Sequence, residues 1–267
     1  MPLRNETVLT IVFVAMLLLG CNAAEKLTSD QTVNSNADTA KANTSAPVPN
    51  DDGTIPSGTG VEKEKPTAGK GNVQGKAFFN DKGAADVEVK LCKTFNQFGG
   101  GCTGETFTAK TDDGGEYVIK NVPPGLYEGL TVRVFNTPFY VFATSGVIAA
   151  AKYNIESDKT YFAPDSHLFK NDLKVTSPKA GSKVAPENIE LKWDAYPEAA
   201  YYKVSIHADT TTGAETQYDY IGKRVDDPVF ALDKPLKPGA YNPKVEAYNA
   251  NDRRLAQSSN DVKFSVK

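Results

Sequence analysis

The chain has 267 residues, and its 30 Lys and Arg against 33 Asp and Glu give a formal net charge of −3 at pH 7. The charges are spread along the sequence and form no basic stripe, so electrostatics do not suggest a nucleic-acid partner. The length exceeds that of one small domain and accommodates two domains of roughly 100 residues behind an N-terminal extension.

The N-terminus carries a targeting signal. An apolar run fills residues 8–19 behind Arg4. It is shorter than the ~20 residues that a helix needs to cross a bilayer, and it is typical of the h-region of a signal peptide. The run ends in Leu18-Leu19-Gly20-Cys21, which resembles the lipobox of bacterial lipoproteins. The resemblance implies a signal peptide over residues 1–20 and acylation of Cys21.

An ordinary secretory signal that happens to contain a cysteine is the alternative. The residue after Cys21 is Asn22 rather than Asp. By resemblance to the sorting rules of Gram-negative bacteria, this implies a lipid anchor in the outer membrane, with the folded part on the periplasmic face or at the cell surface. The first predicted partner is therefore the membrane, contacted through acylated Cys21.

The other two cysteines are predicted to pair. Acylation of Cys21 leaves Cys92 and Cys102 as an even pair in an exported, oxidising compartment. They bracket the hairpin-like stretch KTFNQFGGG. We predict a disulfide between them, with two buried free thiols as the alternative.

A disordered linker is predicted between the anchor and the folded part, over residues 21–72. Residues 22–72 contain no aromatic side chain and consist mostly of small polar and charged residues. Such a segment buries too little apolar surface to offset the entropy lost on ordering.

Residues 73–172 are predicted to form a first β-sandwich. Short runs with alternating apolar residues recur between turn signals over 73–79, 87–95, 106–111, 116–122 and 126–136. The residues that carry a family resemblance are Gly75, Asp86 to Val89, Thr111-Asp112, Gly115 to Tyr117 and Pro124-Gly125-Leu126-Tyr127. They resemble the carboxypeptidase regulatory-like family. The resemblance implies a prealbumin-like sandwich that carries no catalytic residue.

Residues 173–267 are predicted to form a second β-sandwich, so the fold class is all-β with two sandwiches in tandem. Alternating runs over 189–195, 199–206 and 236–249 resemble a fibronectin type III domain. The resemblance implies that Trp193 is the core tryptophan and that Tyr241 forms a tyrosine corner by bonding back to the backbone. Pro-Gly-x-Tyr occurs in both predicted domains, ending at Tyr127 and Tyr241.

The sequence carries no catalytic or metal-binding motif. Its two histidines, His167 and His207, lie far apart, and HExxH, Cys-x-x-Cys and G-x-S-x-G are absent. GGGCTG at residues 99–104 has the spacing of a dinucleotide-binding loop, but an extended stretch follows it instead of a helix. We predict no enzyme, no cofactor and no metal; the alternative of a calcium ion at the turn Asp112-Asp113 stays open.

Three groups of aromatic residues are candidate binding residues. Phe95 and Phe98 lie in the Gly-rich stretch FNQFGGG, and Phe139 and Tyr140 lie in FNTPFYVF. In both, the alternative is that the rings pack on the sandwich. Tyr201, Tyr218 and Tyr220 are the third group, as a flat outward platform for a sugar ring, although tyrosine is also a good strand former.

The predicted function is a non-catalytic lipoprotein that binds or scaffolds proteins in the cell envelope. Carbohydrate binding is the alternative and requires an exposed row of aromatic rings. An enzyme would require a polar pocket with perturbed carboxylates between the two domains.

Overall fold

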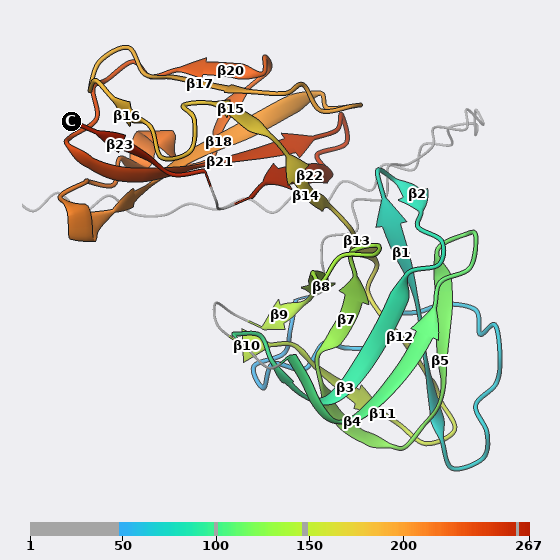
Figure 1. Cartoon of the computed structure of the whole chain (residues 1–267). Coiled ribbons are helices and arrows are strands. Elements are labelled where there is room, and N and C mark those ends of the chain that lie inside the picture. Colours follow the sequence, from blue (N-terminus) through green and yellow to red (C-terminus); the bar gives the residue numbers. More distant parts are fainter. Residues whose placement is uncertain (1–47, 99–100, 146–148, 260–261) are drawn as a thin grey trace, which may run out of the picture. The chain divides into compact units, whose positions relative to one another are not determined.

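A computed structural model describes residues 48–98, 101–145, 149–259 and 262–267 of the chain (Figure 1). The described residues belong to one compact unit. The predicted signal peptide, Cys21 and the first part of the predicted linker lie outside the described residues. Within the described ranges, no helix has the length and apolar character that crossing a membrane requires.

The described chain is all-β and folds as two β-sandwiches. The first contains β1 (Gly71–Phe79), β2 (Lys82–Gly83), β3 (Glu88–Asn96), β4 (Gly101–Lys110), β5 (Glu116–Val122), β6 (Gly125–Glu128), β7 (Leu130–Arg133), β8 (Tyr140–Phe142), β9 (Thr144–Ser145), β10 (Ala149–Ala150), β11 (Lys152–Ile155), β12 (Thr160–Phe162) and β13 (Ser166–His167).

Two sheets enclose the core of the first sandwich. One sheet has the order β12-β1-β5, with β2 and β13 also paired to β1, and the other has the order β4-β3-β7-β8. Strands β6 and β11 form a separate pair, as do β9 and β10. The alternating apolar residues of the sequence point into one shared core, which contains Val73, Val89, Leu91, Tyr117, Ile119, Leu130 and Val132.

A segment that we call the strap, residues 50–64, is part of the first sandwich. The linker prediction is therefore wrong from residue 50 onward, because this segment lies against the folded domain. Ile55 is only 2 % exposed and belongs to the core. The Tyr161 hydroxyl donates to the Ile55 carbonyl at 2.9 Å. One buried aliphatic side chain and regular backbone pairing are enough to order a polar segment, and composition alone did not show this.

The strap closes two strand edges with its own backbone. The Ile55 N–H donates to the Lys152 carbonyl of β11, and the Gly58 N–H donates to the Phe162 carbonyl of β12, each at 2.9 Å. Gln74 holds the next turn of the strap, because its side chain accepts from the Lys63 N–H at 2.9 Å and donates to the Val61 carbonyl at 3.0 Å.

The second sandwich begins with β14, three residues before the predicted boundary at 173. Its strands are β14 (Lys170–Leu173), β15 (Val175–Ser177), β16 (Lys183–Val184), β17 (Glu190–Trp193), β18 (Tyr201–Asp209), β19 (Lys223–Val225), β20 (Val229–Ala231), β21 (Gly239–Tyr248), β22 (Arg254–Ser258) and β23 (Phe264–Val266), with 3₁₀ turns at Thr210–Thr212 and Tyr218–Tyr220.

A three-stranded sheet and a larger sheet form the second sandwich. The small sheet has the order β15-β17-β20, and the large one has the order β14-β22-β21-β18-β19, with β23 also paired to β21. Trp193 is buried and packs edge-to-face on Tyr202, with ring centroids 5.3 Å apart. The prediction that Trp193 is a core residue is confirmed.

Both sandwiches contain the same tyrosine corner. The Tyr241 hydroxyl donates to the Lys237 carbonyl, and the Tyr127 hydroxyl donates to the Pro123 carbonyl, each at 2.9 Å and four residues back. Both tyrosines are buried. The Pro-Gly-x-Tyr glycines, Gly125 and Gly239, have φ of 146° and 147°, a conformation that other residues rarely adopt. The prediction for Tyr241 is confirmed.

We expect Tyr127→Phe and Tyr241→Phe each to destabilise the sandwich that contains the corner by about 1–2 kcal/mol. Each change leaves a carbonyl without its donor and removes one hydrogen bond. Chemical denaturation followed by near-ultraviolet circular dichroism measures the effect. Tyr218→Phe is the control, because Tyr218 is 82 % exposed. Corner variants as stable as this control would contradict the role of the hydroxyls.

We expect Ile55→Ala to destabilise the first sandwich by about 2–4 kcal/mol, because it leaves a cavity in the core. The exposed strap residue Val61 provides the matched control, and Val61→Ala is expected to change stability by less than about 0.5 kcal/mol. Thermal unfolding of both variants makes the comparison. Equal stability of the two variants would show that the strap does not contribute to the core.

Candidate functional site

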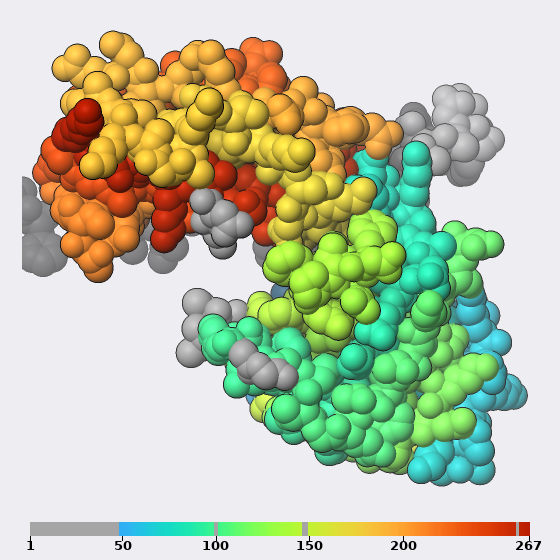
Figure 2. Space-filling model, viewed as in Figure 1, coloured from blue at the N-terminus to red at the C-terminus, as the bar shows by residue number. Residues whose placement is uncertain are grey.

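The disulfide-linked hairpin of β3 and β4 carries the first group of predicted binding residues. Cys92 and Cys102 form a disulfide, with Cα atoms 5.3 Å apart, so this prediction is confirmed. Within the hairpin, Phe98 is 79 % exposed, whereas Phe95 is half-buried. The space-filling view shows the hairpin region at the surface of the first sandwich (Figure 2).

The second predicted group lies at the edge of the same sheet, on and just before β8. Phe139 is 51 % exposed, and Tyr140 is exposed as well. Phe142, two residues after Tyr140, packs edge-to-face on Phe95 with ring centroids 4.9 Å apart. The structure thus brings together two stretches that are separate in the sequence. We call Phe95, Phe98, Phe139, Tyr140 and Phe142 the aromatic edge; within it, Phe98 in the turn after β3 and Phe139 before β8 lie toward opposite ends of the sheet.

Cationic side chains accompany the aromatic edge. The Lys90 Nζ lies 5.9 Å from the centre of the Tyr140 ring. Arg133 stands directly opposite Tyr140 in the pairing of β7 with β8. Its Nε donates to the Thr137 carbonyl at 2.9 Å, which ties the turn before β8 to β7. This face of the sheet therefore combines apolar rings with positive charge.

The third predicted group does not form a platform. Tyr201 lies on the outer face of β18, as expected, but other side chains cover it. The Arg224 guanidinium lies 3.8 Å from the centre of its ring, and Tyr248 stacks on it with centroids 5.1 Å apart. Its hydroxyl donates to Asp252 at 2.9 Å. Burial raises the pKa of Tyr201, and the hydrogen bond to Asp252 adds to the shift.

Tyr220 is also buried, so the platform prediction is wrong for two of its three residues. The Tyr220 hydroxyl donates to Asp233 at 2.6 Å, and its ring packs edge-to-face on Phe230. Of the three tyrosines, only Tyr218 is exposed. A single exposed ring does not make the flat row that carbohydrate binding was predicted to need.

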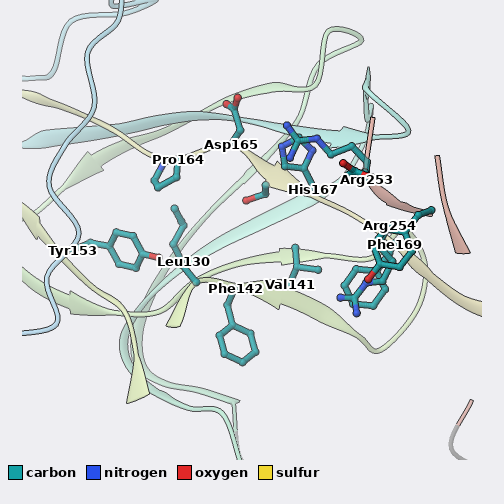
Figure 3. A pocket seen from close by; sticks show the side chains of 14 residues that line it. Leu130, Val141, Phe142, Tyr153, Pro164, Asp165, His167, Phe169, Arg253 and Arg254 are labelled. Carbon is teal, nitrogen blue, oxygen red and sulfur yellow. The ribbon is translucent and has the colours of Figure 1, made fainter. Parts of the chain in front are cut away.

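A cavity of about 460 Å³ opens beside β8 (Figure 3). Figure 3 shows Val141, Leu130 and Tyr153 on one side and Pro164, Asp165 and His167 on the other. The lining residues are Leu130, Val141–Ala143, Tyr153, Pro164–His167, Phe169, Tyr248 and Asp252–Arg254. The volume lies within the range of small-molecule sites, about 300–1,000 Å³.

Two titratable groups in and near this cavity, His167 in its lining and Asp81 beside Arg253, have lowered pKa values. Burial lowers the pKa of His167, and the charge of Arg253 lowers it further. Burial acts to raise the pKa of Asp81, which is ion-paired to Arg253, but hydrogen bonds from Asn251 and Asn249 outweigh it and keep the pKa low. A carboxyl group that donates a proton near neutral pH needs the opposite shift.

The contacts of His167 are those of a packed ring. Its ring stacks on Phe78 at 5.6 Å, and among the described residues it has no hydrogen bond to a serine, threonine or cysteine side chain. The arrangement therefore fits a packed, neutral histidine at the rim of a cavity.

Asp112, at the turn considered for calcium, is used by the fold. One carboxylate oxygen accepts from the Gly114 and Glu116 N–H groups, each at 2.9 Å. The other oxygen accepts from the Lys63 ammonium group at 2.9 Å. Lys63 and these backbone bonds hold the pKa of Asp112 low. In the part of the chain that the structure describes, no group of three or more His, Cys, Asp and Glu residues is placed to hold a metal ion.

Comparison with known proteins shows no family for this chain. No family model matches the chain, and no curated protein matches it. The resemblance of the first sandwich to carboxypeptidase regulatory-like domains therefore stays a prediction. The second sandwich packs the small sheet β15-β17-β20 on the large one, and its resemblance to fibronectin type III domains likewise stays a prediction.

Solved structures with similarity to the chain are β-sandwich proteins. Fibronectin(III)-like modules of Clostridium thermocellum CbhA show 22 % identity over 36 % of this chain and 94 % of their own, with a TM-score of 0.27. A candidate carbohydrate-binding protein from Bacteroides uniformis shows 11 % identity over 70 % and 94 %, with a TM-score of 0.27. The major pilin subunit BcpA of Bacillus cereus shows 14 % identity over 74 % and 69 %, with a TM-score of 0.26. Scores at this level carry no argument about function.

We expect the stability of the protein to fall between pH 7.5 and pH 5.5, in part through His167. Its folded pKa lies below the ordinary value of about 6.5, so the unfolded chain binds the proton more readily. The stabilisation is complete above pH 6.5 and is lost as the pH falls through the folded pKa. Thermal unfolding at both pH values is the measurement.

His167→Gln should reduce the difference in melting temperature between the two pH values. His207→Gln is the control, since His207 is the other histidine and is exposed. A difference that is unchanged in His167→Gln would contradict the assignment.

Proposed function

We propose that this protein is a non-catalytic binding or scaffold module of the bacterial cell envelope, anchored through acylated Cys21, and that its partner is another protein. The observation that carries the proposal is the aromatic edge. Phe98 and Phe139 expose most of their apolar surface, on a hairpin fixed by a disulfide and at the edge of a packed sheet. Exposed apolar rings on a rigid element are typical of protein–protein contact sites.

The geometry of the rings favours a protein over a glycan. Phe95 and Phe142 meet edge-to-face at an interplanar angle of 65°, so they do not present one flat surface. Phe139 and Tyr140 are consecutive residues at an extended strand, and their side chains therefore point to opposite faces. A protein surface adapts to such a three-dimensional arrangement, whereas a sugar ring stacks on a flat one.

The strap supports a role as a presented module. It enters the first sandwich at about residue 50 and is bonded to β11 and β12. In the proposed arrangement, the linker from the acylated Cys21 ends at the strap, not at residue 72. The folded part then begins directly where the linker ends, and both sandwiches follow it in the chain.

Site-specific photo-cross-linking in cells tests the proposal. A photoreactive phenylalanine analogue replaces Phe98 or Phe139. In the controls it replaces Tyr218 or Val61, which are exposed and do not belong to the aromatic edge. We expect Phe98 and Phe139 positions to yield the same protein adduct, and the control positions to yield none. Protease shaving of intact cells decides on which side of the outer membrane that adduct is sought.

Absence of a protein adduct at both aromatic positions, or equal adducts at all four, would overturn the proposal. Binding of purified protein to immobilised envelope glycans that is lost in Phe98→Ala would instead support the carbohydrate alternative. The two outcomes are distinguishable because the adduct is a polypeptide in one case only.

A further inference from the structure

The first sandwich protects its strand edges unequally. The strap occupies the edges of β11 and β12 by donating its own N–H groups to their carbonyls. Strand β4 carries an irregularity opposite Lys93, where Gly104 has φ of 73°, and an exposed Glu105 follows. Bulges and charges of this kind keep an edge from pairing with other chains. Strand β8 has neither a bulge nor a charged side chain, and only its short length of three residues, Tyr140–Phe142, limits pairing at its edge.

The backbone of β8 has unused hydrogen-bonding groups on its outer side. Among the described strands, β8 pairs with β7 alone. The Val134 N–H donates to the Phe139 carbonyl, which makes these two residues a hydrogen-bonded pair. Such pairs alternate along an antiparallel ladder, so Val132 and Val141 form the next one. The N–H and C=O groups of Tyr140 and Phe142 therefore point away from β7.

Pairing on the other side of β7 agrees with this register. The Cys92 N–H donates to the Gly129 carbonyl, so the bonds between β3 and β7 use Thr131 and Arg133. Val132 is thus left for β8. The N–H and C=O groups of Tyr140 and Phe142 therefore point to the side where the next strand of the sheet would pair.

The open edge borders the cavity. Three consecutive residues, Val141, Phe142 and Ala143, line the cavity. Because alternate residues of a strand point to opposite faces, a cavity on one face would contact only every second residue. The cavity therefore reaches the edge of the strand. Figure 3 shows Val141 directed toward the cavity and the ring of Phe142 directed away from it. An added strand would find backbone partners at the edge and an apolar wall of Leu130, Val141 and Tyr153 beside it.

We infer that β8 binds an extended peptide segment of a partner protein as an additional strand. This inference rests on the proposed function and names the class of partner. Backbone hydrogen bonds to Tyr140 and Phe142 supply affinity, and alternate side chains supply specificity. Apolar residues of the peptide face the cavity. An acidic residue is favoured on the other face, opposite Arg133 and beside Tyr140; the Lys90 ammonium group on that face lies 3.6 Å from the Glu88 carboxylate.

Amide hydrogen exchange of the mature chain, read by NMR, tests the open edge without any variant or partner. We expect the Val141 amide to exchange slowly and the Tyr140 and Phe142 amides to exchange at least tenfold faster. Slow exchange of Tyr140 and Phe142 in the absence of peptide would show that the edge is already occupied and would overturn the inference. That result would leave cross-linking from Phe98 and Phe139 unaffected.

Selection from a phage-displayed library of linear twelve-residue peptides tests the occupant. We expect enriched peptides to alternate apolar residues, to carry an acidic residue, and to slow the Tyr140 and Phe142 amides on binding. Tyr140→Pro removes one outward N–H and should weaken binding at least tenfold. Tyr140→Ala removes the same ring but keeps the N–H, and it should weaken binding less than threefold.

Three results would overturn the inference. One is a selection that enriches no peptide. The second is equal weakening by Tyr140→Pro and Tyr140→Ala, with wild-type unfolding transitions in both variants. The third is a concentration-dependent dimer in light scattering that Tyr140→Pro abolishes, because the occupant of β8 would then be a second copy of the chain. If Tyr140→Pro does not fold, the protection of the two amides by peptide decides the question.

Discussion

A tyrosine hydroxyl bonded to the carbonyl four residues before it fixes one corner of each sandwich, and the rest of each fold is arranged around it. Tyr127 and Tyr241 make this bond with the same length of 2.9 Å. Each ring then serves as a core residue: Tyr127 meets Phe107 edge-to-face, and Tyr241 stacks on Phe264. A buried hydroxyl without a partner is costly, so the corner specifies where the chain turns from one sheet to the other.

Closure of strand edges is the second constraint on the first sandwich. A sheet edge with unpaired N–H and C=O groups tends to pair with any available strand. The chain closes two of these edges with the strap, and Ile55 fastens the strap by entering the core. The edge at β8 stays open, and the exposed ring of Phe139 directly precedes it. The strand whose edge the fold leaves open is therefore the strand at which we infer that a partner binds.

For the aromatic side chains, the local sequence pattern determines the face of the strand, whereas contacts with distant residues determine the exposure to solvent. Strand alternation correctly placed Tyr201 on the outer face of its sheet. Arg224 and Tyr248, which are remote in sequence, cover that ring from two sides and remove it from solvent. Phe95 and Phe142 are likewise remote from one another, and their contact joins two predicted binding stretches into one surface. No periodicity within one strand encodes such contacts.

The sequence by itself determined the all-β class and the disulfide between Cys92 and Cys102, because alternation and cysteine parity are local, while the core role of Trp193 and the corner at Tyr241 came from the resemblance to fibronectin type III domains. The tertiary structure decided the rest. It ordered the strap, which has a polar composition and a single buried anchor at Ile55. It buried Tyr201 and Tyr220, and it left the edge of β8 open. Those outcomes depend on contacts with residues that are distant in the sequence. The residues adjacent in the chain do not determine such contacts.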